Sequence, residues 1–268
     1  EALLDGADSL KEQIRQAGNA AGRMELRRME DTMLWTAQNL MGTYHSLEAE
    51  QAAASARAKA QKHLSEKVKD QEMLGSSTSY HSQEAYQKWQ SALNEYERLK
   101  KEQERVRQEL LLLTGFSPDS PVVLEKMPLP DVSRAALVNP QEDRQQALGN
   151  NYELRSGRMG NAGSNQELHK KQRQTELDEN QMFASLETLG DQIRSRQAEW
   201  EAACAKEQAQ RAVWQSAVRK REQGTMAEGE YLEIYSQYME EKGNQAQASI
   251  RFLLAMEEYD WAKKGLMD

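Results

Sequence analysis

The sequence predicts an all-α protein built from two related, long antiparallel coiled-coil hairpins. Strong helix formers dominate its 268 residues, 29% of the residues are charged, and the mean hydropathy is −0.90. Runs of 32 and 39 residues without Gly or Pro, residues 43–74 and 76–114, flank Gly75. All five prolines fall between Pro118 and Pro140. Long helices packed through narrow seams fit this composition better than a thick globular core.

Charge and hydropathy exclude two broad classes of protein. The net charge is −8 with both signs interspersed, and the absence of a basic block argues against a nucleic-acid partner. The longest apolar run, residues 252–256, is far shorter than the roughly 20 residues that span a membrane. The single cysteine, Cys204, excludes an internal disulfide framework. No signal peptide is recognisable in this chain.

The chain divides into two helical repeats and a linker. Residues 1–116 form the first hairpin repeat with its tip at Gly75, and residues 146–268 form the second with its tip at Gly224. The Pro-rich residues 117–145 form a non-helical connection. Glycine can adopt φ > 0, so each tip glycine can end one helix and let the chain reverse. Ser, Thr and acidic residues after each glycine suit the start of the next helix.

A heptad pattern extends through both repeats in one register. After Gly75 the seam positions alternate four and three residues apart: Ala85, Trp89, Ala92, Tyr96, Leu99, Gln103, Val106, Leu110 and Leu113. A shift of 149 residues places Gly75 on Gly224 and gives the second seam: Ile234, Tyr238, Glu241, Gln245, Ala248, Phe252, Ala255, Tyr259 and Ala262. Before the glycines, the in-phase pairs are Met33/Met182, Ala37/Leu186, Leu40/Leu189, Tyr44/Ile193, Leu47/Arg196, Ala54/Ala203 and Val68/Ala217. This match predicts internal duplication of a coiled-coil hairpin.

A Gly-Asn-Ala element recurs upstream of each long helix. It lies within residues 17–22 and again within residues 159–164, an offset of 142 instead of 149. We expect turns or helix breaks at both places. The second descending helix should then be seven residues longer than the first, which is one heptad and preserves the seam.

Several motifs together resemble TolC-type outer-membrane efflux proteins. Residues 146–156, QALGNNYELRS, resemble the Ala-Leu-x-x-Asn-Pro-Glu-Leu-Arg box that opens one half of that family, with Tyr152 in place of proline. Residues 110–116, LLLLTGF, resemble the Leu-rich end of its first half. Residues 258–266, EYDWAKKGL, carry the Tyr-x-x-Ala-x-x-x-Leu ending of its second half. Gly75 and Gly224 occupy the places of the family's hairpin-tip glycines.

The resemblance implies a TolC-like α-barrel protomer, with one departure. Family members carry strand pairs between the helices of each half, and these strands form a β-barrel in the outer membrane. This chain has only the Gly-Asn-Ala elements there, without the alternating pattern of a spanning strand. We therefore expect a protomer without the membrane β-barrel.

The resemblance also implies two sets of site residues. In the family, the tips dock on a periplasmic adaptor, and the corresponding residues here are Leu74, Gly75, Ser76, Gly224, Thr225 and Met226. Acidic residues near Glu230 and Glu233 line the narrow entrance of the family's tunnel. Two readings of these acids stay open: a charged ring that sets ion preference, or ordinary acids at a helix start. The matching residues of the first repeat are His81 and Glu84.

No catalytic, metal or cofactor site is recognisable, and we expect no enzymatic activity. The histidines, His45, His63, His81 and His169, lack metal-ligand spacing and should be solvated surface residues. Cys204 should be a small packing residue. The aromatic residues of the seams should be core residues: Trp89, Tyr96, Trp200, Trp214, Tyr238 and Tyr259.

Two functions remain open. The favoured one is a subunit of an efflux or secretion conduit, extracytoplasmic in the cell envelope. By resemblance it is a homotrimer that works with a periplasmic adaptor and an inner-membrane transporter. The alternative is a structural coiled-coil scaffold or spacer without a lumen.

Overall fold

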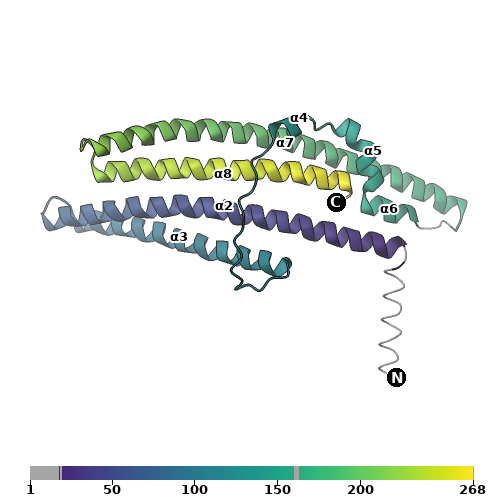
Figure 1. Cartoon of the computed structure of the whole chain (residues 1–268), viewed down its shortest axis with the longest axis horizontal. Helices are drawn as coiled ribbons and strands as arrows, with labels where there is room; N and C mark the ends of the chain where they lie inside the picture. Colours follow the sequence, from purple (N-terminus) through teal and green to yellow (C-terminus); the bar gives the residue numbers. More distant parts are fainter. Residues whose placement is uncertain (1–17, 19, 160–162, 268) are drawn as a thin grey trace, which may run out of the picture. The chain divides into compact units, whose positions relative to one another are not determined.

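Long helices account for most of the chain (Figure 1). The computed structural model describes residues 18, 20–159 and 163–267. Its helices are α2 (Ala20–Met73), α3 (Ser79–Leu113), α4 (Val132–Ala136), α5 (Pro140–Asn150), α6 (Tyr152–Met159), α7 (Asn165–Glu222) and α8 (Glu228–Lys264). No β-strand occurs among these residues, and none of the helices they form is long and apolar enough to cross a membrane.

The two hairpin tips have equivalent positions. Helices α2 and α7 each end two residues before a glycine, and α3 and α8 each begin four residues after it. These glycines, Gly75 and Gly224, have φ of 74° and 71°. The prediction that the 149-residue shift aligns the tips is therefore confirmed.

Helix α7 has 58 residues and α2 has 54, so the excess is four residues and the expected seven was wrong. The cause lies in the first Gly-Asn-Ala element, where α2 begins at Ala20 and contains Gly22. Asn19 of that element lies outside the described residues. In the second element, residues 160–162 lie outside them too, between the end of α6 and the start of α7.

The described chain falls into two compact units that cut across the repeats. Unit 1 comprises Glu1–Gln38, Asp131–Ser195 and Leu254–Asp268, and unit 2 comprises Asn39–Pro130 and Arg196–Leu253. Each unit therefore takes segments from both repeats. The linker, expected to be non-helical, contains α4 and the first turns of α5. Asp131 and Asn139 start these helices by accepting backbone N–H bonds from Ser133 and Gln141.

In unit 2 the helices lie in the order α3, α2, α8, α7 (Figure 1). Helices α2 and α3 line a shared groove from Ala54 to Glu95. Helix α8 lies against the opposite face of α2: a Cβ at Gly243 would lie 3.3 Å from the Ala49 carbonyl oxygen. Because both faces of α2 are covered, it buries alanines at every second position: Ala54, Ala56, Ala58 and Ala60.

Helix α7 packs on α8 in unit 2 through aromatic pairs. The rings of Trp214 and Tyr238 stack with centroids 4.6 Å apart, and those of Trp200 and Phe252 lie 5.8 Å apart. None of the eighteen predicted seam positions of α3 and α8 is exposed. Trp89 and Tyr96 are half-buried, as are Trp200 and Trp214, whereas Tyr238 and Tyr259 are buried. Tyr238 and Tyr259 are therefore core residues as expected, whereas the other four aromatic residues are only partly covered.

Unit 1 is held together around the last turns of α8. Arg134 of α4 binds Glu257 and Asp260 of α8, at 2.7 and 2.5 Å. Gln38 of α2 donates to Glu257 and accepts from the Trp261 indole N–H. Polar bonds thus fix both α4 and α2 to α8, a role that the heptad pattern does not reveal.

Candidate functional site

Each tip is closed by the same set of hydrogen bonds. The N–H groups of Gly75 and Ser76 donate to the carbonyls of Glu72 and Gln71, and those of Gly224 and Thr225 donate to Arg221 and Lys220. This pattern is a Schellman motif, in which glycine takes the left-handed position. The hydroxyl groups of Ser76 and Thr225 each donate a further 3.0 Å bond to the same carbonyls, Gln71 and Lys220. The duplication therefore extends to individual tip atoms.

The two tips present different surfaces. The first tip is apolar, because Leu74 is 83% exposed and Met73 and Tyr80 lie nearby and are also largely exposed. The second is built around Arg221, which pairs with Glu228 at 3.0 Å and lies over the Tyr231 ring at 4.2 Å. Among the predicted docking residues, Leu74, Gly75, Ser76, Gly224 and Thr225 are exposed and Met226 is half-buried. The tips thus offer one apolar and one polar contact surface.

Glu230 and Glu233 are both exposed in the first turns of α8. Glu233 accepts a 3.3 Å bond from the neutral amide of Gln237. At the equivalent place in α3, Glu84 pairs with Lys88 at 2.7 Å, and this hydrogen bond lowers the Glu84 pKa. The lysine neutralises the acid in the first repeat, whereas the amide leaves the Glu233 charge uncompensated by its neighbour. Of these two equivalent acids, Glu84 therefore has a cation as its partner and Glu233 has a neutral amide.

The linker is fastened to the first hairpin by two residues that sequence reasoning did not identify. Arg107 of α3 donates to the backbone carbonyls of Pro118, Ser120 and Val122, the shortest bond being 2.7 Å. His45 of α2 donates from Nε2 to the Glu125 carbonyl at 2.8 Å.

The expectation of surface histidines is wrong for His45, which is only 9% exposed. Its second ring nitrogen, Nδ1, lies 3.0 Å from the Glu48 carboxylate, so both nitrogens are engaged. His63 is half-buried, and its ring lies close to Gly229. His81 and His169 are exposed as expected. Burial of His45 depends on the linker crossing it, which a helix pattern cannot show.

Two motifs that are far apart in the sequence, residues 146–156 and 258–266, meet in unit 1. Gly265 ends α8 with φ of 112°, and a Cβ at this position would lie 2.2 Å from the Asn150 carbonyl oxygen. The Asn150 side chain donates to the Lys263 carbonyl, and the Tyr152 N–H donates to the Gly265 carbonyl. The glycine is required because the α5–α6 junction lies directly against its backbone.

Tyr152, where the resembling motif has proline, is the first residue of α6. Proline is favoured at that position but has no N–H, so it could not donate to Gly265. The Tyr152 hydroxyl also donates to Asp31 of α2 at 2.7 Å. Burial and this bond raise the Tyr152 pKa to about 12. Tyr152 in place of proline therefore adds two hydrogen bonds within unit 1, one to Gly265 and one to Asp31.

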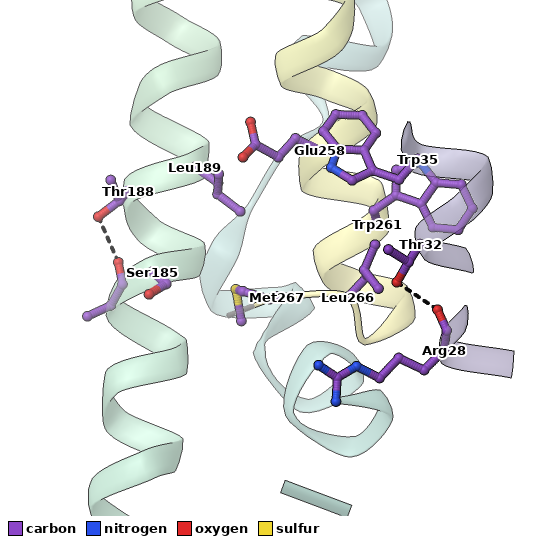
Figure 2. Close-up of a pocket in the computed structure, with 11 residues that line it drawn as sticks. Arg28, Thr32, Trp35, Ser185, Thr188, Leu189, Glu258, Trp261, Leu266 and Met267 are labelled. Atoms are coloured by element: carbon purple, nitrogen blue, oxygen red, sulfur yellow. Dashed lines mark hydrogen bonds between the residues drawn. The ribbon is translucent and has the colours of Figure 1, made fainter. Parts of the chain in front are cut away.

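A cavity of about 570 Å³ lies among α2, α7 and the end of α8 (Figure 2). Trp35 of α2, Leu189 of α7 and Trp261 of α8 contribute apolar wall. The hydroxyls of Thr32 and Thr188 donate to backbone carbonyls of their own helices. Glu258 lines the cavity and is exposed, yet partial burial of its carboxyl raises its pKa. The threonine hydroxyls are thus turned to their own helices, and the cavity shows no nucleophile paired with a base.

The predicted packing role of Cys204 agrees with its surroundings. It is half-buried on α7, and its sulfur accepts a 3.7 Å contact from the Gln245 amide of α8.

Comparison with known proteins bears on the fold. Neither a protein-family model nor a curated protein matches the sequence. Among solved structures, CusC matches with a TM-score of 0.62 at 12% identity, over 97% of this chain and 87% of CusC. The outer-membrane channel OprN matches with a TM-score of 0.55 at 14% identity, over 91% of this chain and 68% of OprN. The outer membrane protein VceC from Vibrio cholerae matches with a TM-score of 0.55 at 13% identity, over 95% and 74% of the two chains.

The matched structures define the class of fold as the α-helical part of an outer-membrane channel protomer. More particularly, the chain has the fold of the helical tunnel of TolC-like efflux channels, which confirms the predicted fold class and the resemblance.

Proposed function

We propose that this chain is one subunit of an oligomeric α-helical conduit in the cell envelope. Its tips would dock on a periplasmic adaptor protein, and an inner-membrane transporter would deliver substrates into the lumen. The subunit itself would catalyse nothing. The observation that carries this proposal is the four-helix layer of unit 2. Its inner helices, α2 and α8, each have two neighbours in the layer, whereas the outer helices, α3 and α7, have one.

Such a layer has two different open edges, which suits a ring. When the α3 edge of one copy meets the α7 edge of the next, the contact is head-to-tail, and it forms a ring when the rotation between copies closes. Apolar side chains are available at both edges, because Tyr86 of α3 is 46% exposed and Val213 of α7 is 48% exposed. OprN is an outer-membrane channel and CusC forms a transmembrane channel, which supports a conduit. Three copies per ring is the count that the family resemblance suggests.

The solution mass tests this proposal. The chain has a mass of 30.6 kDa, and a ring of three copies should appear at three times that value in light scattering. Val213→Glu should shift the population toward monomer, because it places a charge in a contact that excludes water. Asn244→Glu, at an exposed position on the inner helix α8, is the control and should leave the mass unchanged.

A wild-type monomer at every concentration would contradict the conduit. It would favour the alternative function, a coiled-coil spacer without a lumen.

A further inference from the structure

The cavity of unit 1 has an apolar wall with a charged residue at each end. Its volume of about 570 Å³ falls within the range of small-molecule sites, roughly 300–1,000 Å³. Figure 2 shows the Glu258 side chain at one end and the Arg28 side chain at the other. Trp35, Leu189 and Trp261 contribute to the wall. The cavity can therefore hold an apolar body whose head group lies beside one of these two charges.

The acidic end of the cavity lacks a partner within the protein. Among residues 20–159 and 163–267, no side chain forms an ion pair or a hydrogen bond with the Glu258 carboxylate. Partial burial raises its pKa, and no neighbouring cation offsets this effect. A carboxylate that has lost part of its hydration without gaining a partner is unfavourable. A cation supplied by a ligand would give Glu258 the partner that the described chain does not provide.

Two tryptophan rings complete the surroundings of this carboxylate. Trp261 follows Glu258 by three residues on α8, so both side chains lie on one face of that helix. The Trp261 ring is held in place, because its indole N–H donates to Gln38 at 2.6 Å and the Lys264 ammonium lies 4.0 Å from the ring centroid. Trp35 contributes a second ring from α2. A flat aromatic body can pack against such fixed rings at a low cost in conformational entropy.

We propose that this cavity binds a small aromatic amine in its protonated form. The ammonium group pairs with the Glu258 carboxylate, and the aromatic body packs against Trp35 and Trp261. Arg28 at the other end repels a second positive group, so the ligand carries its charge at one end only. The lining residues all belong to unit 1. Binding therefore requires neither ring assembly nor an adaptor.

Naphthalene probes that differ only in their head group test this site in the full chain. The probes are 1-naphthylmethylammonium, the neutral 1-naphthylmethanol and the anionic 1-naphthylacetate. Isothermal titration calorimetry at neutral pH measures the dissociation constant of each. The ammonium probe should bind at least about tenfold more tightly than the alcohol, because a charge-assisted hydrogen bond to a carboxylate is stronger than a neutral one. The anionic probe should bind more weakly than the ammonium probe, because its charge has the same sign as Glu258.

Single substitutions then assign the binding to the cavity. Glu258→Gln keeps the shape and removes the charge, so it should lower the affinity for the ammonium probe to that for the alcohol. Glu153→Gln is the matched control, because it changes the net charge equally at an exposed position of α6 outside the cavity. Ala184→Trp places an indole in the cavity from an exposed position of α7 and should weaken the binding of all three probes. Circular dichroism checks that each variant is folded.

Four outcomes would overturn the proposal. Absence of saturable binding to the folded wild type would exclude a ligand site, and equal affinities for the three probes would leave only an unselective apolar hollow. Equal losses in Glu258→Gln and Glu153→Gln would indicate general attraction to an acidic surface. Unchanged binding in folded Ala184→Trp would place the probe elsewhere. None of these results depends on the solution mass, so this test and the test of the conduit fail independently.

Discussion

Asn151 is a fully buried polar residue whose hydrogen bonds hold one end of unit 1 together. Its side-chain oxygen accepts the Leu154 N–H and caps α6, and its amide donates to the Met267 carbonyl. The adjacent Asn150 carbonyl lies against Gly265. At the scale of single residues, substitutions at this junction should therefore be strongly destabilising.

Gly265→Ala should be strongly destabilising. The positive φ costs about 1–2 kcal/mol for any residue with a Cβ, and the clash with Asn150 adds roughly 1–3 kcal/mol. Urea denaturation should show the loss. Gly149→Ala in α5 is the matched control: its Cβ would meet nothing within 4 Å, and the change should stabilise the helix by up to about 1 kcal/mol. Equal stability of the two variants would contradict the observed junction.

Tyr152 contributes to the stability of unit 1, and this contribution is lost at alkaline pH. Because the folded-state pKa lies above the usual value of 10, the fold favours the neutral phenol. Its contribution is fully present below pH 10 and is lost as the pH rises toward about 12. Tyr152→Phe should cost roughly 1.5–3 kcal/mol at neutral pH, the value of a hydrogen bond to a charged group.

The difference in unfolding free energy between wild type and Tyr152→Phe should shrink as the pH rises from 10 to about 12. Denaturation curves at several pH values measure this difference. A gap that stays constant would show that the phenol does not titrate differently in the folded chain.

At the scale of helices, the C-terminal ends of the four long helices share one geometry. Each of α2, α3, α7 and α8 ends in a Schellman motif with a glycine at positive φ: Gly75, Gly115, Gly224 and Gly265. The hydrogen bonds of each motif join residues at most five positions apart, so the position of the glycine determines where each helix ends. Helix partners depend on the seams instead.

Leu110→Ala should cost roughly 2–5 kcal/mol, the usual range for a large-to-small change in a core. Leu110 is 3% exposed near the end of α3. Two positions along the same helix, Leu112 is 60% exposed, so Leu112→Ala should change the unfolding free energy little. Thermal scans of both variants make the comparison. Similar losses at the two positions would remove support for the heptad assignment.

At the scale of the whole molecule, the proposed conduit predicts that substitutions at the tips impair adaptor binding without unfolding the helices. Thr225→Trp or Met226→Trp should leave helix content unchanged, because both residues lie in the turn between α7 and α8. Thr225→Trp loses one exposed side-chain bond, to the Lys220 carbonyl, so melting should change little. Pull-down with the cognate adaptor, and export with it, should fall sharply. Retained adaptor binding would leave Gly224 as a turn only.

Charge reversal near the tip should act on ions and not on docking. Glu230→Lys with Glu233→Lys should lower the cation preference of the reconstituted conduit, because carboxylates attract cations and lysines repel them. Conductance under an ion gradient measures the preference. Glu84→Lys is the comparison, and its effect should be smaller because Lys88 already neutralises that acid. An unchanged cation preference would mean that Glu230 and Glu233 are ordinary acidic residues at the start of a helix.

The sequence by itself determined the features that depend on neighbouring residues. Positive-φ glycines, caps and heptad spacing are local, so the tip positions at Gly75 and Gly224 and the buried seam from Ala85 to Leu110 were predictable. Five of the six predicted tip residues are exposed for the same reason, and Met226 is half-buried.

Only the tertiary structure decided which helices become neighbours and what the linker touches. Placing α2 between α3 and α8 explains its alternating buried alanines, a pattern that no single seam predicts. The linker buries His45 and engages Arg107 through carbonyls about 10 to 80 residues away in the chain. In these contacts a side chain binds backbone carbonyls from a distant part of the chain. The spacing of apolar residues along a helix does not indicate which distant segment will lie against it. Seam residues could therefore be read from the sequence, whereas Asn151, His45 and Arg107 could be recognised only in the folded chain.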